Sequence, residues 1–211
     1  MIKAMLSNEA VHLPPSACPT ILAEAGRRRP SLIPDLTMID GPGGMMSATP
    51  ELKKLTAADA AAYQALRLEG LLRHPCEFGA AFEEEADLSL EEVGRRLDEG
   101  WIFGAFVEGE LLAIAGYRRS DRLKKRHKAE LFGVYVGTNG RRRGLGEAVV
   151  REVIAKAASE VEQLLATVAT ANLPAKSLYE KLGFVTFGHE PRAHKVDDRY
   201  FDQDHMVLML V

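Results

Sequence analysis

From residue 51 onward, short apolar runs alternate with longer amphipathic stretches, and turns rich in glycine, proline or polar residues separate them. Short apolar runs between turn residues are typical of buried strands, whereas apolar residues three or four positions apart are typical of helices. The pattern predicts strands at 51–55, 101–107, 111–117, 131–136, 163–169, 184–188 and 204–211. It predicts helices at about 59–70, 89–100, 145–157 and 174–182, and therefore an α/β domain.

Residues 1–50 differ in character from the rest of the chain. They hold seven of its ten prolines, and the run 40–44 reads Asp-Gly-Pro-Gly-Gly, which is typical of a hinge. We therefore predict a Pro/Gly-rich, poorly ordered arm at 1–45 and one folded domain at 46–211. Met45 and Met46 follow the glycines directly, which leaves open a native start at that point.

Composition narrows the classes of function. A chain of 211 residues that is 46% hydrophobic can bury one core, and its net charge of −3 creates no field that attracts nucleic acid or an anionic membrane. No apolar run is long enough to span a bilayer, and no signal peptide is recognisable. Cys18 and Cys76 lie far apart, so we interpret them as reduced thiols in the cytoplasm. His189, His194 and His205 lack a metal-ligand spacing, so no metal is expected.

The stretch 134–153 carries the most informative pattern. An apolar run ends in turn residues at 137–140, and three arginines, two glycines and a helical pattern follow. The first turn of a helix leaves backbone N–H groups unpaired, and the helix dipole makes that end partly positive. Gly144 and Gly146 have no side chains that would keep an anion away from these amides. We therefore predict that a pyrophosphate binds here.

Two common phosphate motifs do not occur. The chain has no Gly-x-x-x-x-Gly-Lys-Ser/Thr string, and Val149 stands where a dinucleotide fingerprint needs its third glycine. The segment 141–146 instead fits Arg-x-x-Gly-x-Gly, and resembles the acyl-CoA signature of the GNAT superfamily of N-acetyltransferases. The segment 172–184, Asn-Leu-Pro-Ala-Lys-Ser-Leu-Tyr-Glu-Lys-Leu-Gly-Phe, resembles the second hallmark of that superfamily, at the expected distance downstream. The resemblance covers roughly residues 51–211.

The resemblance implies a fold and a cofactor. The implied fold is a mixed central sheet of about six or seven strands, with helices on both faces. A bulge at 134–136 is implied to part this strand from the strand at 163–169, so that the pantetheine arm of acetyl-CoA fills the gap like an added strand. The implied cofactor-binding residues are Val134, Tyr135, Val136, Arg141, Arg142, Arg143, Gly144, Leu145, Gly146, Asn172 and Tyr179.

The resemblance also implies two catalytic side chains. An alkyl amine with a pKa near ~10.4 is mostly protonated at neutral pH, so it must lose a proton before it attacks the thioester. Glu130 lies in the strand where several branches of the superfamily carry this base, and its alternative is an ion pair with the basic run at 118–128. Tyr179 stands where the superfamily often has the acid that protonates the departing thiolate, and its alternative is packing against the pantetheine.

The acceptor side carries less pattern. The expected partners are acetyl-CoA and a primary amine of a small molecule or protein, and the resemblance alone suggests a homodimer. Candidate acceptor contacts are Phe78, Phe82 and 83–85, together with Asp197, Asp198, Asp202, Tyr200 and Phe201 in a loop expected at 190–203.

Two functions of other classes stay open. One is a non-catalytic acyl-CoA sensor, which would keep the cofactor cleft without acceptor chemistry, and Tyr179 argues against it. The other is a nucleic-acid-binding module that uses the basic residues at 118–128 and 141–143 and binds in a salt-sensitive way. We expect the enzyme, with no nucleic-acid or membrane partner.

Overall fold

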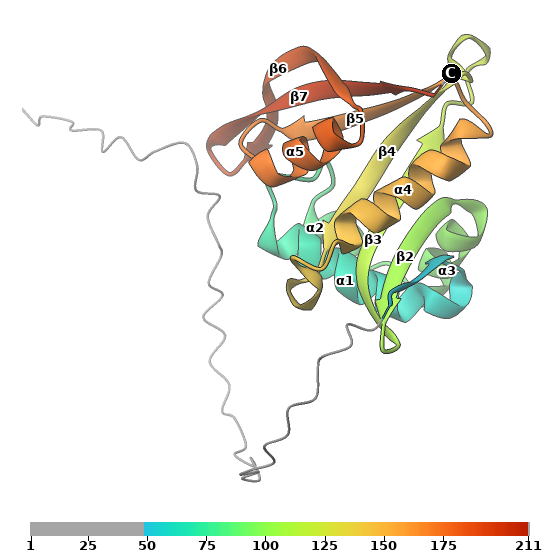
Figure 1. The fold of residues 1–211 in the computed structure, drawn as a ribbon. Helices are drawn as coiled ribbons and strands as arrows, with labels where there is room; N and C mark the ends of the chain where they lie inside the picture. Colours follow the sequence, from blue (N-terminus) through green and yellow to red (C-terminus); the bar gives the residue numbers. More distant parts are fainter. Residues whose placement is uncertain (1–48, 211) are drawn as a thin grey trace, which may run out of the picture.

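The computed structural model describes residues 49–210, so the predicted arm at 1–45, with Cys18, lies outside the described residues. Seven strands form one sheet: β1 (Glu51–Lys54), β2 (Trp101–Val107), β3 (Glu110–Arg119), β4 (Lys128–Val136), β5 (Gln163–Ala169), β6 (Val185–Val196) and β7 (Arg199–Met209). Their order is β1-β2-β3-β4-β5-β7-β6 (Figure 1). Within this sheet β4 and β5 are parallel, and the other neighbours are antiparallel. The predicted mixed sheet is confirmed.

Helices cover both faces of this sheet (Figure 1). They are α1 (Ala60–Arg73), α2 (Phe82–Glu85), α3 (Leu90–Glu99), α4 (Leu145–Ala158) and α5 (Leu173–Lys181), with short 3₁₀ turns at Ala57–Asp59, Leu123–Lys125 and Thr138–Gly140. Helices α1 and α3 pack on one face of β2 to β4, and α4 packs on the other. Along β3, Ala113 and Ala115 belong to the α4 core and Ile114 to the α1–α3 core, as expected for a strand that is buried on both faces.

The predicted helix starts are found. Ser89 Oγ accepts a hydrogen bond from the Glu92 N–H at 3.2 Å, and Asp59 Oδ2 accepts one from the Thr56 N–H at 3.0 Å. Helix α1 continues past the predicted end at Gly70. A Cβ on this glycine would lie 3.0 Å from the ring of a tyrosine in β4, so the glycine lets α1 pack closely on the sheet.

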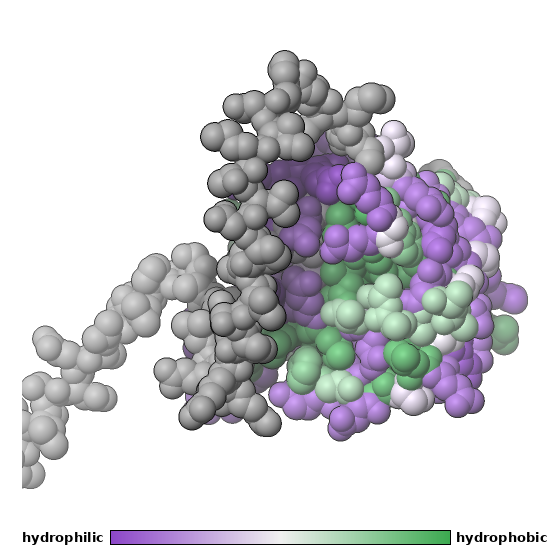
Figure 2. Space-filling view, turned by 90° about the horizontal axis from the view of Figure 1, so that it is seen from below, coloured by the Kyte–Doolittle hydropathy of each residue, from purple (hydrophilic) through white to green (hydrophobic). Residues whose placement is uncertain are grey.

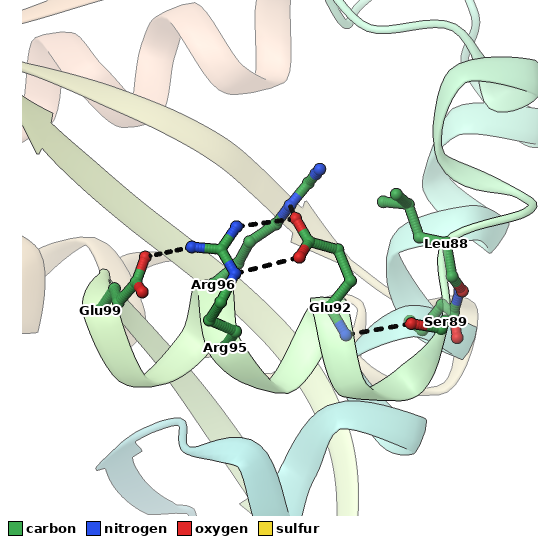
Figure 3. A network of polar contacts seen from close by, with 7 residues as sticks. Leu88, Ser89, Glu92, Arg95, Arg96 and Glu99 are labelled. Carbon is green, nitrogen blue, oxygen red and sulfur yellow. Dashed lines mark hydrogen bonds and ion pairs between the residues drawn. The ribbon is translucent and has the colours of Figure 1, made fainter.

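The outer side of α3 carries a chain of ion pairs (Figure 3). Arg95 bridges Glu92 and Glu99, with N···O distances of 2.8 and 2.6 Å, and Arg96 Nε bonds Glu92 at 2.9 Å. Such pairs three or four residues apart on an exposed helix surface stabilise the helix only weakly. They also fix the position of Arg96, which lines the cleft described below.

The C-terminal hairpin corrects one prediction. The segment 190–203, expected to be a loop, belongs to the long paired strands β6 and β7, which turn at Asp197 and Asp198. The start of β6 matches the strand predicted at 184–188. Most residues of β6 are exposed, and from residue 190 onward it has no apolar run that a sequence pattern could reveal. Its pairing with β7 and a two-residue turn hold it in place, and Asp197 adopts a φ of 52° that aspartate tolerates better than most residues.

The surface of the described domain is mixed in character. In Figure 2, apolar side chains gather in the middle of one face, and hydrophilic side chains surround them. Among the helices of residues 49–210, none has both the length and the apolar character needed to cross a membrane.

Candidate active site

The two central strands part along the length of β4. Their pairing covers three positions of β4 and ends at Glu130, opposite Leu165. On its other edge, β4 has one more residue than β3 between two paired positions, and Gly133 in this bulge has a φ of +63°. A bulge bends its strand and interrupts its ladder, so residues 134–136 have no pairing with β5. The expected gap between these strands is confirmed.

A cleft of about 600 Å³ occupies this gap. Its walls come from β4, β5, α1, the segment between α1 and α2, and α5. Three of the residues predicted to bind the cofactor, Val134, Asn172 and Tyr179, line it. The ring of Tyr135 is buried in the α1–α3 core, and its hydroxyl donates to Glu69 at 3.2 Å, so only its backbone can face the gap.

Helix α4 begins beside the end of β4. Gly144 is its N-cap residue and has a φ of +74°, a left-handed conformation that costs a residue with a side chain about 1–2 kcal/mol. A Cβ on Gly146 would lie 3.2 Å from Val136 Cγ2, so the missing side chain lets the first turn approach β4 closely. The N–H groups of that turn have no carbonyl within the helix to bond, which makes them available to an anion.

The three arginines before α4 differ in their surroundings. Arg141 Nη2 donates to His74 Nε2 at 2.9 Å, which ties this arginine to the end of α1. Arg142 is exposed and has a φ of 60°, and Arg143 is exposed as well. The positive charge at the start of α4 is therefore partly fixed and partly free to follow a ligand.

Tyr179 lies in α5 with its ring facing the core and the cleft. The side chain is buried, and its ring packs against Phe184 with the ring centroids 5.6 Å apart. Burial, together with the negative charge of Glu77, raises the pKa of the Tyr179 phenol well above its usual range. The phenol therefore stays protonated at neutral pH, as a proton donor must.

Glu130 lines the cleft at the last paired position of β4. Arg118, opposite it in β3, donates from Nε at 3.0 Å and from Nη2 at 2.9 Å to Glu130 Oε2. The ion pair that the sequence left open as an alternative is thus present. Because both side chains are exposed, such a pair contributes only about 0–1 kcal/mol, and it leaves the second carboxylate oxygen accessible.

The comparison with family models decides to which protein family the chain belongs. Residues 67–184, more than half of the chain, match the model described as the acetyltransferase (GNAT) family. This chain belongs to the GNAT family. It is therefore an acyltransferase, and its gap between β4 and β5 lies where the two sequence hallmarks meet. No curated protein matches the chain.

Solved structures agree with this assignment. A GNAT-family acetyltransferase from Streptococcus pneumoniae is 26% identical, with a TM-score of 0.68 over 76% of this chain and 99% of that one. The putative acetyltransferase yncA from Salmonella typhimurium, solved with acetyl-CoA, is 19% identical, with a TM-score of 0.66 over 78% and 95%. A phosphinothricin acetyltransferase from Sinorhizobium meliloti, in complex with acetyl-CoA, is 20% identical, with a TM-score of 0.67 over 76% and 88%. The last two show likeness of fold.

The GNAT cleft contains a carboxylate that the sequence did not reveal. Glu77 lies in the segment after α1 and lines the cleft, and its Oε2 accepts from Asn172 Nδ2 at 2.8 Å. Asn172 Oδ1 in turn caps α5 by accepting from the Ala175 N–H at 3.1 Å. Burial raises the pKa of Glu77, and the nearby charge of Arg141 opposes this only in part. No periodic pattern surrounds Glu77, so its position depends on tertiary contacts.

The predicted acceptor contacts fall into two groups. Phe78, Glu84 and Glu85 line the cleft. The three aspartates of the hairpin do not, since Asp197 and Asp198 form its turn and Asp202 accepts from the Arg192 N–H at 2.8 Å. From this hairpin, His194 and Gln203 reach the cleft instead. The predicted acceptor contacts that line the cleft therefore lie in α2 and in the segment before it.

Proposed function

We propose that this GNAT enzyme transfers an acetyl group from acetyl-CoA directly to a primary amine of a small molecule or protein. The observation that carries the proposal is the gap between β4 and β5, which opens beyond Glu130 next to the glycine-bearing start of α4. Acetyl-CoA as the donor is further supported by the two similar folds that were solved with it.

In the proposed complex, the cofactor follows the backbone. The pantetheine arm lies along Val134, Tyr135 and Val136, whose N–H and C=O groups are not paired with β5. The pyrophosphate accepts hydrogen bonds from the amides at the start of α4, and Asn172 holds the first turn of α5 beside the cleft. The residues proposed around the pyrophosphate are Arg141, Arg142, Arg143, Gly144, Leu145 and Gly146.

The proposed reaction is a direct displacement in a ternary complex. A carboxylate, Glu130 or Glu77, takes a proton from the acceptor ammonium, and the free amine attacks the carbonyl carbon of the thioester. Backbone N–H groups of β4 stabilise the oxyanion of the tetrahedral intermediate. When the C–S bond breaks, Tyr179 gives its proton to the thiolate of CoA, and the proton lost from the attacking nitrogen restores the balance through solvent. No covalent enzyme intermediate is needed.

The proposal is tested first by cofactor binding. Titration calorimetry with CoA should show binding in the wild type, and Gly144→Ala should weaken it at least about tenfold, because the left-handed cap conformation is strained by a side chain. Gly109→Ala is a matched control, since Gly109 has a φ of +81° and, like Gly144, open space around a built Cβ. It lies in the turn between β2 and β3, and we expect unchanged affinity.

Turnover is tested separately. Release of the CoA thiol should require both acetyl-CoA and an amine, and Tyr179→Phe should lower kcat about 100-fold without changing CoA affinity. If calorimetry shows that CoA binds but none of a broad panel of amines causes release of the CoA thiol, the result would favour the acyl-CoA sensor. The absence of CoA binding would overturn the proposal as a whole. A cytoplasmic location and a homodimer stay predictions.

A further inference from the structure

Arg67 of α1 is the most unusual polar side chain of the cleft. Only 9% of the residue is exposed, and it lines the cleft. Its Nε and Nη2 donate to the two carboxylate oxygens of Glu85 at 2.9 and 2.8 Å, and its guanidinium stands 5.0 Å from the ring centre of Phe78. These contacts hold the guanidinium plane in one orientation.

The third nitrogen of this guanidinium has no partner. Of the buried side-chain nitrogen and oxygen atoms in residues 49–210, only Arg67 Nη1 lacks a hydrogen bond. A buried donor without an acceptor is costly, and native structures rarely keep one without a reason. Nη1 lies 4.0 Å from the position of a Cβ built on Gly133, the bulge residue directly before the backbone segment proposed to hold the pantetheine arm. The donor therefore lies in the cleft beside the bulge, at one end of the segment proposed for the pantetheine arm.

The charges around the cleft decide what kind of oxygen fits this donor. Arg67 is already neutralised by Glu85, and Arg118 by Glu130. Arg96, the remaining arginine of the lining, is bonded to Glu92 (Figure 3). Two further carboxylates, Glu77 and Glu84, line the cleft without a cationic side chain within ion-pair distance other than His74 beside Glu77. A second carboxylate brought in by a ligand would thus be repelled, whereas a neutral carbonyl oxygen would not.

We propose that the acceptor carries a neutral carbonyl oxygen within a few bonds of its reactive amine, as an α-amino amide does, and that Arg67 Nη1 donates a hydrogen bond to this oxygen. This inference rests on the proposed acetyl transfer and defines its substrate class. The surrounding carboxylates favour the ammonium group of the incoming acceptor, and the arginine fixes the oxygen, so the two contacts together orient the nitrogen toward the thioester.

The test compares three amines of similar shape: alaninamide, alanine and isopropylamine. We expect the wild type to have its highest kcat/KM with alaninamide. Arg67→Lys keeps a cation beside Glu85 but has no fixed third donor. We expect Arg67→Lys to lower kcat/KM for alaninamide about 10- to 100-fold. The kcat/KM for isopropylamine should change less than about threefold, and the KM for acetyl-CoA should stay unchanged. Ratios between variant and wild type cancel the different basicities of the amines.

Arg96→Lys is the matched control, because Arg96 also lines the cleft but has its partner in Glu92. It should leave the order of the three amines unchanged. The inference is overturned if the wild type prefers alanine or isopropylamine to alaninamide, or if Arg67→Lys slows all three amines equally. If Arg67→Lys does not fold, the wild-type comparison decides the matter, with each kcat/KM referred to the concentration of unprotonated amine so that the different basicities do not enter. CoA binding, measured by calorimetry, reports separately on the proposed function.

Discussion

Glu77 and Glu130 are carboxylates of the same cleft in different surroundings. Burial raises the pKa of Glu77, whereas Glu130 forms an exposed ion pair with Arg118. A general base is most effective when its pKa lies close to the pH at which the enzyme works. The raised pKa brings Glu77 closer to this condition than an ordinary carboxyl group, although the family resemblance pointed to Glu130.

The first prediction distinguishes these two residues. Glu77→Gln should lower kcat/KM at neutral pH about 100-fold and remove the acidic limb of its pH profile, because the basic form of Glu77 is populated only above its raised pKa. Glu130→Gln, the control at the same cleft, should retain the acidic limb and lose less than about fivefold. The opposite assignment would follow if Glu130→Gln abolished the limb while Glu77→Gln kept it.

The raised pKa of Glu77 also predicts how stability should behave in that variant. The contribution of the Glu77 carboxyl group to stability is fully present below a pH of about 4.5. It is lost as the pH rises through the pKa that this group has in the folded protein. At pH 7 the buried charge therefore costs stability. A glutamine can still accept from Asn172 Nδ2, so Glu77→Gln should melt at the same temperature or higher. A loss of activity in this variant would then not result from unfolding.

At the scale of elements, Asp204 of β7 joins the helix that carries Tyr179 to the C-terminal hairpin. Its carboxylate accepts from Lys176 Nζ at 2.7 Å and from Thr170 Oγ1 at 3.2 Å, at and just before α5. It also contacts His189 Nδ1 of β6 at 2.9 Å. Lys176, then His189, lowers the pKa of Asp204 to about 2. One side chain thus connects α5, β6 and β7.

The second prediction follows from these contacts. Asp204→Asn should lower the free energy of unfolding by about 2 kcal/mol at pH 7, because hydrogen bonds to a charged group are lost. In the wild type, this contribution is present above pH of about 4 and is lost as the pH falls toward the folded-state pKa of about 2. Urea unfolding at pH 7 and pH 2 should show the difference between variant and wild type shrinking at the lower pH. A constant difference would contradict the assignment.

The elements also show what the sequence could reveal. Helix α4 was predictable because Leu145, Val149 and Val153 repeat at helical spacing and are all buried. The start of β6 was predicted as a strand at 184–188, but its continuation to Val196 was not, because pairing with β7 holds this part rather than burial. In the site, the glycines and Tyr179 belong to local motifs. Glu77 and Arg67 instead depend on partners that are 95 and 18 residues away in sequence, and no local pattern records such contacts.

At the scale of the whole domain, two parts of the sheet meet at the cleft. The strands β1 to β4 pack with α1, α3 and α4, whereas β5 to β7 carry α5 and share the α4 core (Figure 1). Three paired positions join β4 to β5, all before the strands part. A ligand in the gap would contact both parts, so its binding should stabilise the domain as a whole. Such stabilisation amounts to about 2.7 kcal/mol at a ligand concentration of 100 times Kd.

The third prediction uses this effect to test the domain boundary. Residues 49–210 already contain the complete sheet and both hydrophobic cores, so a chain of residues 46–211 should fold and melt at the temperature of the full chain. For a domain of this size, CoA at 100 times Kd should raise the melting temperature of both chains by roughly 5–10 °C. Gly144→Ala in the short chain should reduce this shift at the same CoA concentration, whereas Gly109→Ala should keep it. A short chain that folds but shows no shift with CoA would place part of the cofactor site within residues 1–45.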